Sequence, residues 1–122
     1  MFDKYRKNIG NIGEEVAVKF LISKGYKVLE RNYLIRGGEI DIIALDGDTL
    51  VFIEVKARYS HEYGLPIEAM TPWKLKALKK SALFYVQDNN LENKLCRFDF
   101  LGIDYTNSKE SPEVELIKNI ID

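Results

Sequence analysis

Two acid-bearing stretches joined by a short turn constrain the fold of this chain most: Gly38-Glu39-Ile40-Asp41-Ile42-Ile43 and Phe52-Ile53-Glu54-Val55-Lys56. They predict β-strands over 39–45 and 50–58. The segment Asp46-Gly47-Asp48 between them favours a hairpin, because Gly and Asp tolerate a positive φ. Side chains alternate between the two faces of a strand. We therefore expect Glu39 and Asp41 on one face of the first strand, and Glu54, Lys56 and Arg58 on one face of the second.

The opposite faces of the same two strands are apolar and predict the core side of the hairpin. They carry Ile40, Ile42 and Ala44 on the first strand, and Val51, Ile53, Val55 and Ala57 on the second. A purely structural sheet would be better served by apolar or neutral residues at the acidic positions. Three carboxylates and an ammonium on one rigid hairpin therefore indicate a divalent-metal site for hydrolysis.

The remaining pattern predicts an α/β fold. An apolar stripe predicts a helix over 11–24 with Gly25 as its stop, followed by a strand over 26–34. Thr71-Pro72 favours a helix start, because Thr caps helices and Pro suits the first helical position; this helix runs to about residue 87. A strand over 97–105 follows, and 114–121 is either a last strand or a short helix. The order α-β-β-β-α-β gives a mixed central sheet flanked by helices, with strands 50–58 and 97–105 parallel across the helical crossover.

Length and composition indicate a single domain, residues 1–122, that is cytoplasmic and does not enter a membrane. Apolar residues make up 46% and charged residues 30% of the chain, and apolar runs extend over only a few residues. One cysteine, Cys96, excludes an intrachain disulfide, and one histidine, His61, excludes a Cys/His zinc site. The net charge of −1 does not by itself indicate nucleic acid. The first 80 residues are net positive and the rest net negative, which permits DNA binding without arguing for it.

The acidic strands have the groups that phosphodiester hydrolysis requires. Carboxylates that hold Mg²⁺ or Mn²⁺ with open positions for water and phosphate supply the positive charge that the reaction needs. Asp41 and Glu54, on paired strands, would ligate one ion, with the backbone carbonyl of Val55 as a further oxygen. Lys56 would lie about 6–7 Å along the strand from Glu54, where it could orient the attacking water or stabilise transition-state charge.

Each of these features also has a structural interpretation. Acid-x-Lys is expected by chance about once in a chain of this length. An ordinary pair of Glu54 and Lys56 on a solvated sheet face is therefore an equal alternative. Glu14 follows Asn11 by three residues, and the pattern alone favours a capping box at the helix start. For Lys76, Lys79 and Lys80 on the second helix, the pattern favours solvation over phosphate contact. No role is assigned to His61 or Cys96.

The combination of motifs resembles the PD-(D/E)XK nuclease superfamily. Within it, the chain is most similar to the YraN-type bacterial family, which is related to the archaeal Holliday-junction resolvases. The resemblance covers nearly the whole chain, and its motifs are Gly13-Glu14, Gly25-Tyr26, Gly38-Glu39-Ile40-Asp41, Asp46-Gly47-Asp48-Thr49-Leu50-Val51, Glu54-Val55-Lys56-Ala57-Arg58, Gly64, Pro66, Lys74 and Cys96-Arg97-Phe98-Asp99. Ile40 stands where the superfamily usually has a proline.

The resemblance implies a restriction-endonuclease-like core and a Mg²⁺-dependent endonuclease that acts on DNA, including branched DNA, in repair or recombination. Asp41 and Glu54 would hold the metal, and Glu14 would support it through a water or a second ion. Lys56 would position the water. Arg58, Lys76, Lys79 and Lys80 would contact phosphates. A homodimer is also implied.

Two other functions stay open at this point. The first is a non-catalytic nucleic-acid-binding or adaptor protein that keeps the nuclease fold. Mg²⁺ binding that disappears in Asp41→Asn would argue against this hypothesis, since a non-catalytic binding module need not bind Mg²⁺. The second is the same chemistry on RNA.

Overall fold

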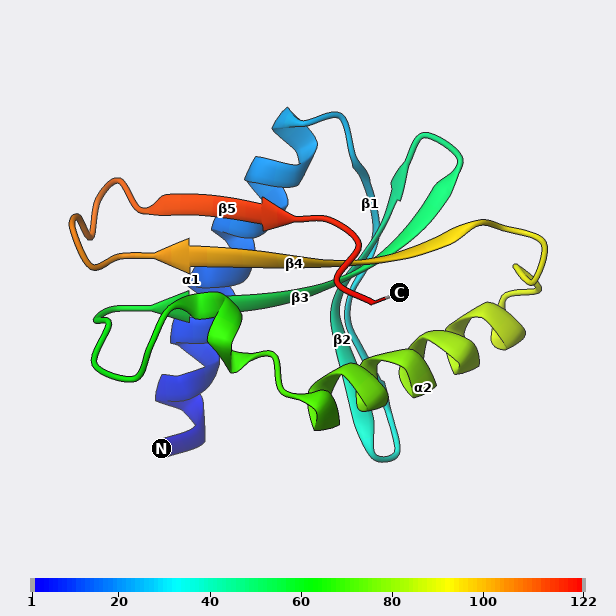
Figure 1. The fold of residues 1–122 in the computed structure, drawn as a ribbon, viewed down its shortest axis with the longest axis horizontal. Helices are drawn as coiled ribbons and strands as arrows, with labels where there is room; N and C mark the ends of the chain where they lie inside the picture. Colours follow the sequence, from blue (N-terminus) through cyan, green and yellow to red (C-terminus); the bar gives the residue numbers. More distant parts are fainter. Residues whose placement is uncertain (1, 122) are drawn as a thin grey trace.

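A five-stranded mixed sheet forms the centre of the molecule, with a helix on each face (Figure 1). The computed structural model describes the backbone of residues 2–121 and the side chains from 13 to 121. In chain order the elements are α1 (Phe2–Ser23), β1 (Lys27–Ile35), β2 (Gly38–Asp46), β3 (Thr49–Arg58), the short 3-10 helix η1 (Pro66–Ala69), α2 (Pro72–Asp88), β4 (Cys96–Asp104) and β5 (Glu113–Ile117). The predicted α/β class and the resolvase-like order of elements are confirmed, and the last segment is a strand.

The strands lie in the order β1-β2-β3-β4-β5. Neighbours are antiparallel except β3 and β4, which run parallel from the pair Leu50 and Cys96 to the pair Arg58 and Asp104. The chain crosses from β3 to β4 through α2, as the strand–helix–strand pattern predicted. Gly47, with a φ of 60°, turns the chain between β2 and β3 where the sequence placed the hairpin.

The core has two layers, one on each face of the sheet. Ile42, Ala44, Val51 and Ile53 pack with Ala17 and Leu21 of α1, whereas Phe52 and Ile43 pack with Leu78, Ala82 and Tyr85 of α2. Ile40 also packs in the second layer. The expectation that Ile40 shares a face with Ile42 and Ala44 is therefore wrong.

The exception at Ile40 follows from a divergence of β2 from β3. The two strands pair from Asp46 and Thr49 only as far as Ile42 and Ile53. Beyond that point β2 remains paired with β1 alone, down to Gly38. A two-stranded ribbon twists more than a wide sheet. The part of β2 that is paired with β1 alone therefore turns away from β3, and in Figure 1 the two strands run in clearly different directions there.

The helix ends show which local signals the fold uses. Thr71 caps α2 by accepting a hydrogen bond from the Lys74 backbone N–H at 3.2 Å, and Pro72 follows, as predicted. Gly25, with a φ of 89°, ends α1 as predicted. However, α1 begins at Phe2, so Asn11 lies inside the helix and the predicted capping box of Asn11 and Glu14 is wrong. Within the described residues, no helix is both long and apolar enough to cross a membrane.

Candidate active site

The candidate site lies where β2 separates from β3. Asp41 is the first residue of β2 beyond the last β2–β3 pair, and its side chain is buried, at 8% exposure. Its Oδ2 accepts a hydrogen bond from the Val55 backbone N–H at 2.8 Å. A carboxylate thus takes a donor that a continuing ladder would have given to a backbone carbonyl. The divergence of the strands therefore makes room for Asp41 and fixes one of its oxygens.

The buried Asp41 and the half-buried Glu54 form a pair of carboxyl groups that repel each other. Burial raises the pKa of Asp41 to about 8, with further contributions from the charges of Glu54 and Glu39, although the Val55 N–H partly opposes the rise. Burial likewise raises the pKa of Glu54. Among the described side chains, neither carboxylate forms an ion pair. Both groups therefore favour a proton or a bound cation.

Two basic side chains of β3 continue from this pair along the strand. Burial lowers the pKa of Lys56, and the positive charges of Lys74 and Arg58 lower it further, against the opposing charges of Glu54 and Asp41. The Arg58 Nε is buried and has no hydrogen-bond partner among the described residues. A buried unpaired donor needs an explanation, and an anionic ligand is one. The predicted grouping of Asp41, Glu54, Lys56 and Arg58 is thus present in the fold.

Lys74 is a site residue that the sequence interpretation missed. It lies in the first turn of α2, and its charge is the largest opposing the rise in the pKa of Glu54 and the largest lowering the pKa of Lys56. The signal that would have found it is helical spacing. Lys74 lies four residues before the buried Leu78 and so belongs to the sheet-facing side of α2, whereas the other lysines of the helix do not.

Glu14 lies on α1 and contacts β1. Its Oε2 accepts a hydrogen bond from Asn32 Nδ2 at 2.9 Å and lies 3.6 Å from an Arg31 guanidinium nitrogen. Glu54 is the charge that acts most on Asp41, followed by Glu39. Lys74, Glu39 and Lys56 are the charges that act on Glu54, and Glu14 is not among the causes for either group. The described residues contain no group of three or more His, Cys, Asp or Glu residues placed to hold a metal. The metal role of Glu14 stays a prediction that requires a water or a second ion.

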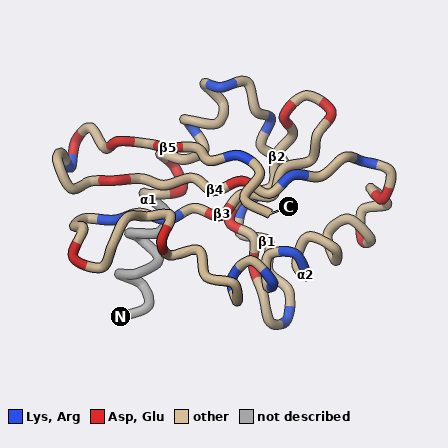
Figure 2. Tube along the Cα trace, viewed as in Figure 1, with Lys and Arg blue, Asp and Glu red and all other residues tan. Residues whose placement is uncertain are grey.

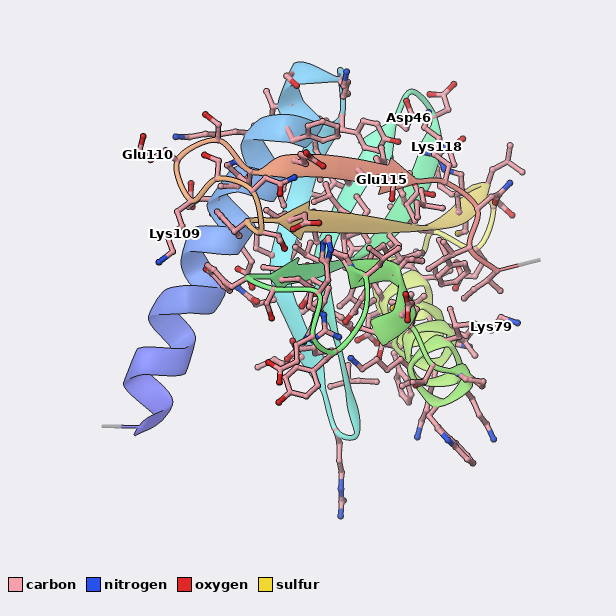
Figure 3. All side chains as sticks on the ribbon, turned by 60° about the vertical axis from the view of Figure 1, so that its left-hand side comes forward. Asp46, Lys79, Lys109, Glu110, Glu115 and Lys118 are labelled. Atoms are coloured by element: carbon pink, nitrogen blue, oxygen red, sulfur yellow. The ribbon has the colours of Figure 1, made fainter. Side chains whose placement is uncertain are left out.

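The three predicted phosphate-binding lysines of α2 are exposed. Lys76 and Lys79 border a shallow hollow that is completed by Ile120 and Ile121 of the C-terminal segment. In Figure 3 the Lys79 side chain extends from α2 away from the sheet. These lysines do not join the carboxyl pair.

Comparison with known proteins identifies the family. The family model described as uncharacterised protein family UPF0102 matches residues 13–103. The chain belongs to this family. A UPF0102 protein of Syntrophus aciditrophicus is 46% identical over 110 residues, which cover 90% of this chain and 85% of the relative. A UPF0102 protein of Caldicellulosiruptor saccharolyticus is 43% identical over 114 residues, which cover 93% and 97%.

Membership of UPF0102 confirms the resemblance to the YraN-type family. A third relative, a UPF0102 protein of Dictyoglomus turgidum, is 47% identical over 97 residues, which cover 80% of this chain and 82% of the relative. The UPF0102 match includes every residue of the candidate site, from Glu14 on α1 to Lys80 on α2. The site thus belongs to the part of the chain that defines the family.

Proposed function

We propose that this UPF0102 protein is a metal-dependent endonuclease that hydrolyses phosphodiester bonds in DNA, including branched or otherwise structured DNA, in repair or recombination. The observation that carries the proposal is the pair formed by the buried Asp41 and the half-buried Glu54, neither of which forms an ion pair with a described side chain. A fold that served structure alone would have no reason to bury two repelling carboxyl groups side by side.

The donors at the pair fit Mg²⁺, with Mn²⁺ as the substitute. Two carboxylates and the Val55 carbonyl are hard oxygen ligands, and Mg²⁺ usually keeps several waters besides one or two protein carboxylates. The second oxygen of Asp41 remains available, because Oδ2 is the atom that bonds to Val55. A divalent cation bound there supplies positive charge to the phosphate oxygens and favours ionisation of the attacking water.

The chain's own residues supply the remaining functions. Lys56 positions the water or stabilises charge that develops on the phosphate. Its lowered pKa brings it closer to exchanging a proton near neutral pH. Arg58 offers its unpaired Nε to a phosphate oxygen. Lys74 adds positive charge beside Glu54, and Glu14 supports the metal through a water or a second ion.

The exposed lysines of α2 extend the positive charge away from the pair. Lys76, Lys79 and Lys80 contact phosphates of the bound strand. In Figure 2 basic residues concentrate in the first half of α2 and at the β1–β2 turn, while acidic residues mark the β2–β3 turn and the far end of α2. A polyanion approaching the carboxyl pair therefore meets positive charge along α2.

A non-catalytic nucleic-acid-binding or adaptor protein is the second candidate. It is favoured by one observation, that the described residues contain no group of three or more His, Cys, Asp or Glu residues placed to hold a metal. Such a protein would bind nucleic acid without cleavage and would not need Mg²⁺. RNA in place of DNA is a variant of the first proposal, and a labelled RNA of the same design tests it.

The test is cleavage of a labelled four-way DNA junction and a matched linear duplex in Mg²⁺ and in Mn²⁺. We expect wild type to cleave and Glu54→Ala and Lys56→Ala to lose about a hundredfold or more of the rate, the typical effect of removing one transition-state contact. Glu115→Ala, at an exposed position of β5 labelled in Figure 3, is the matched control and should retain activity. No cleavage by wild type, or equal cleavage by all variants, would reject the nuclease proposal.

A further inference from the structure

The solvent side of α2 carries two exposed aromatic residues interleaved with lysines. We define the outer face of α2 as Trp73, Lys76, Lys80 and Phe84. Building on the proposed function, we propose that this outer face binds an unpaired nucleic-acid strand that continues from the phosphate at the carboxyl pair. The expected substrates of the protein are then a fork, a flap or a junction with a single-stranded arm.

The four residues form one continuous stripe. They follow one another at steps of three or four residues, so they lie on one side of a helix with 3.6 residues per turn. The side facing the sheet is formed by Leu78, Ser81, Ala82 and Tyr85, which are all buried. The aromatic residues on the outer face are thus not an extension of the core.

The exposure of the aromatic residues is the first argument. Trp73 is 79% exposed and Phe84 is 44% exposed. Most of Trp73 and nearly half of Phe84 are thus left in solvent on a charged helix surface. Grouped exposed apolar residues mark interaction sites. The face of an aromatic ring is a platform on which a base can stack.

The charge of the same face is the second argument. Lys76 and Lys80 lie between Trp73 and Phe84, and both are exposed. The turn of the β1–β2 hairpin lies against α2, since a Cβ added at Gly38 would be only 2.3 Å from the Ser81 Oγ. The same turn carries the exposed Arg36, and Figure 2 shows basic residues both at this turn and in the first half of α2. Cations flanked by aromatic rings match a strand that offers both phosphates and bases.

The position of Trp73 connects this face to the carboxyl pair. Trp73 immediately precedes Lys74, whose charge acts on both Glu54 and Lys56. From Trp73 to Phe84 the helix extends about 16 Å at 1.5 Å per residue. A strand leaving the carboxyl pair therefore meets Trp73 first and then runs along α2. Bases in an intact duplex are already stacked on each other, so an aromatic platform selects unpaired bases.

The chain offers a direct probe, because Trp73 is its only tryptophan. Unlabelled oligothymidine, a forked duplex and a blunt duplex are titrated into wild type in EDTA, where no metal-dependent cleavage occurs, and Trp73 fluorescence is recorded. We expect saturable quenching by the oligothymidine and the fork, and much less by the blunt duplex. Binding that is detected by anisotropy of a labelled oligothymidine but leaves the Trp73 emission unchanged would overturn the proposal. Equal quenching by the blunt duplex would overturn it as well.

Substitutions then separate stacking from charge. We expect Trp73→Ala to bind the labelled oligothymidine about 5- to 100-fold more weakly, the range measured for loss of one stacked base, and Trp73→Phe to retain most of the affinity. Lys80→Gln should lower the slope of log affinity against log salt by about 0.7. Lys109→Gln, which lies on the opposite side of the molecule in Figure 3, should leave the slope unchanged. Equal affinity of wild type and Trp73→Ala would refute the stacking role.

Failure of this inference is distinguishable from failure of the proposed function. Junction cleavage without quenching of Trp73 would retain the nuclease and reject the outer face. Quenching by the single strand without cleavage of any substrate would retain the face and reject the nuclease. Absence of both would reject both.

Discussion

Asp41→Asn is expected to stabilise the metal-free protein at alkaline pH while it abolishes Mg²⁺ binding. The amide keeps the size of the side chain and an oxygen that can accept the hydrogen bond from Val55, which the carboxylate accepts at 2.8 Å. It removes the negative charge that burial and Glu54 both disfavour. The substitution therefore tests whether the buried pair is a cost to folding that only a function explains.

The magnitude follows from the pKa of Asp41, which rises from its ordinary 3.8 to about 8 on folding. An acid with a raised pKa binds a proton more tightly in the folded chain than in the unfolded chain. The free energy of unfolding therefore falls as pH rises from about 4 to about 8, and the stabilising contribution is complete only below pH 4. At 1.36 kcal/mol per pH unit, the ceiling of this loss is roughly 6 kcal/mol. Either carboxyl can relieve the repulsion by keeping its proton, so we expect Asp41→Asn to gain at least about 1 kcal/mol at pH 9, or about 4 °C in Tm.

The assay is urea denaturation followed by circular dichroism between pH 5 and pH 9, in EDTA and again in Mg²⁺. Wild type should lose stability with rising pH in EDTA and regain it in Mg²⁺. Asp41→Asn should lose less stability over the same range, because only Glu54 keeps a raised pKa, and it should be insensitive to Mg²⁺. Asp99→Asn is the matched control, because Asp99 is fully buried and bonds to Arg97, Tyr26 and the Asn119 N–H. It should lose stability. An Asp41→Asn protein that is less stable than wild type at pH 9 would refute the reasoning.

Two further substitutions test the surroundings of the pair. Lys74→Met removes the largest charge that opposes the rise in the pKa of Glu54. The acidic limb of the pH–rate profile should therefore move to higher pH, and the rate at neutral pH should fall about tenfold. Lys109→Met, at an exposed position, is the control, and an unshifted profile of Lys74→Met would exclude Lys74 from the site. Gly38→Ala should cost about 1–3 kcal/mol, because the new Cβ would lie 2.3 Å from the Ser81 Oγ. Ser81→Ala in the same chain should restore part of the stability in a denaturation experiment, and no restoration would show that the close approach is not the cause.

The elements of the fold were predictable wherever a local rule decides them. Gly47 and its flanking acids specify the β2–β3 hairpin, and Thr71 followed by proline specifies the start of α2, because turn and cap chemistry depend on neighbouring residues alone. The parallel pairing of β3 and β4 followed from a helix that lies between two strands. The start of α1 was not predictable in this way. A capping pattern at Asn11 is meaningful only if the helix begins there, and nothing local reveals that the helix continues back to Phe2.

Most residues of the candidate site were predictable from the sequence, but their arrangement in space was not. Alternation along β3 correctly grouped Glu54, Lys56 and Arg58, because β3 stays paired with β4 as far as Arg58 and keeps its period there. Alternation failed at Ile40, because β2 there is paired on one side only and the ribbon twists. Lys74 was missed for a related reason. Lys74 lies near Glu54 and Lys56 because of the way α2 packs on the sheet. Spacing within the helix indicates which side of α2 faces the sheet, but not which strand residues lie opposite.

The divergence of β2 from β3 gives Asp41 two separable functions. The side chain satisfies the Val55 N–H, which the departing strand would otherwise leave without a partner. It also brings a negative charge next to Glu54. Asparagine or aspartate would serve the first function equally, since both carry an acceptor oxygen of the same reach. Only aspartate serves the second, and that function lowers the stability of the metal-free chain. Position 41 thus carries aspartate although asparagine is expected to give a more stable metal-free chain. This is an argument for a cation at the site, and it does not depend on family resemblance.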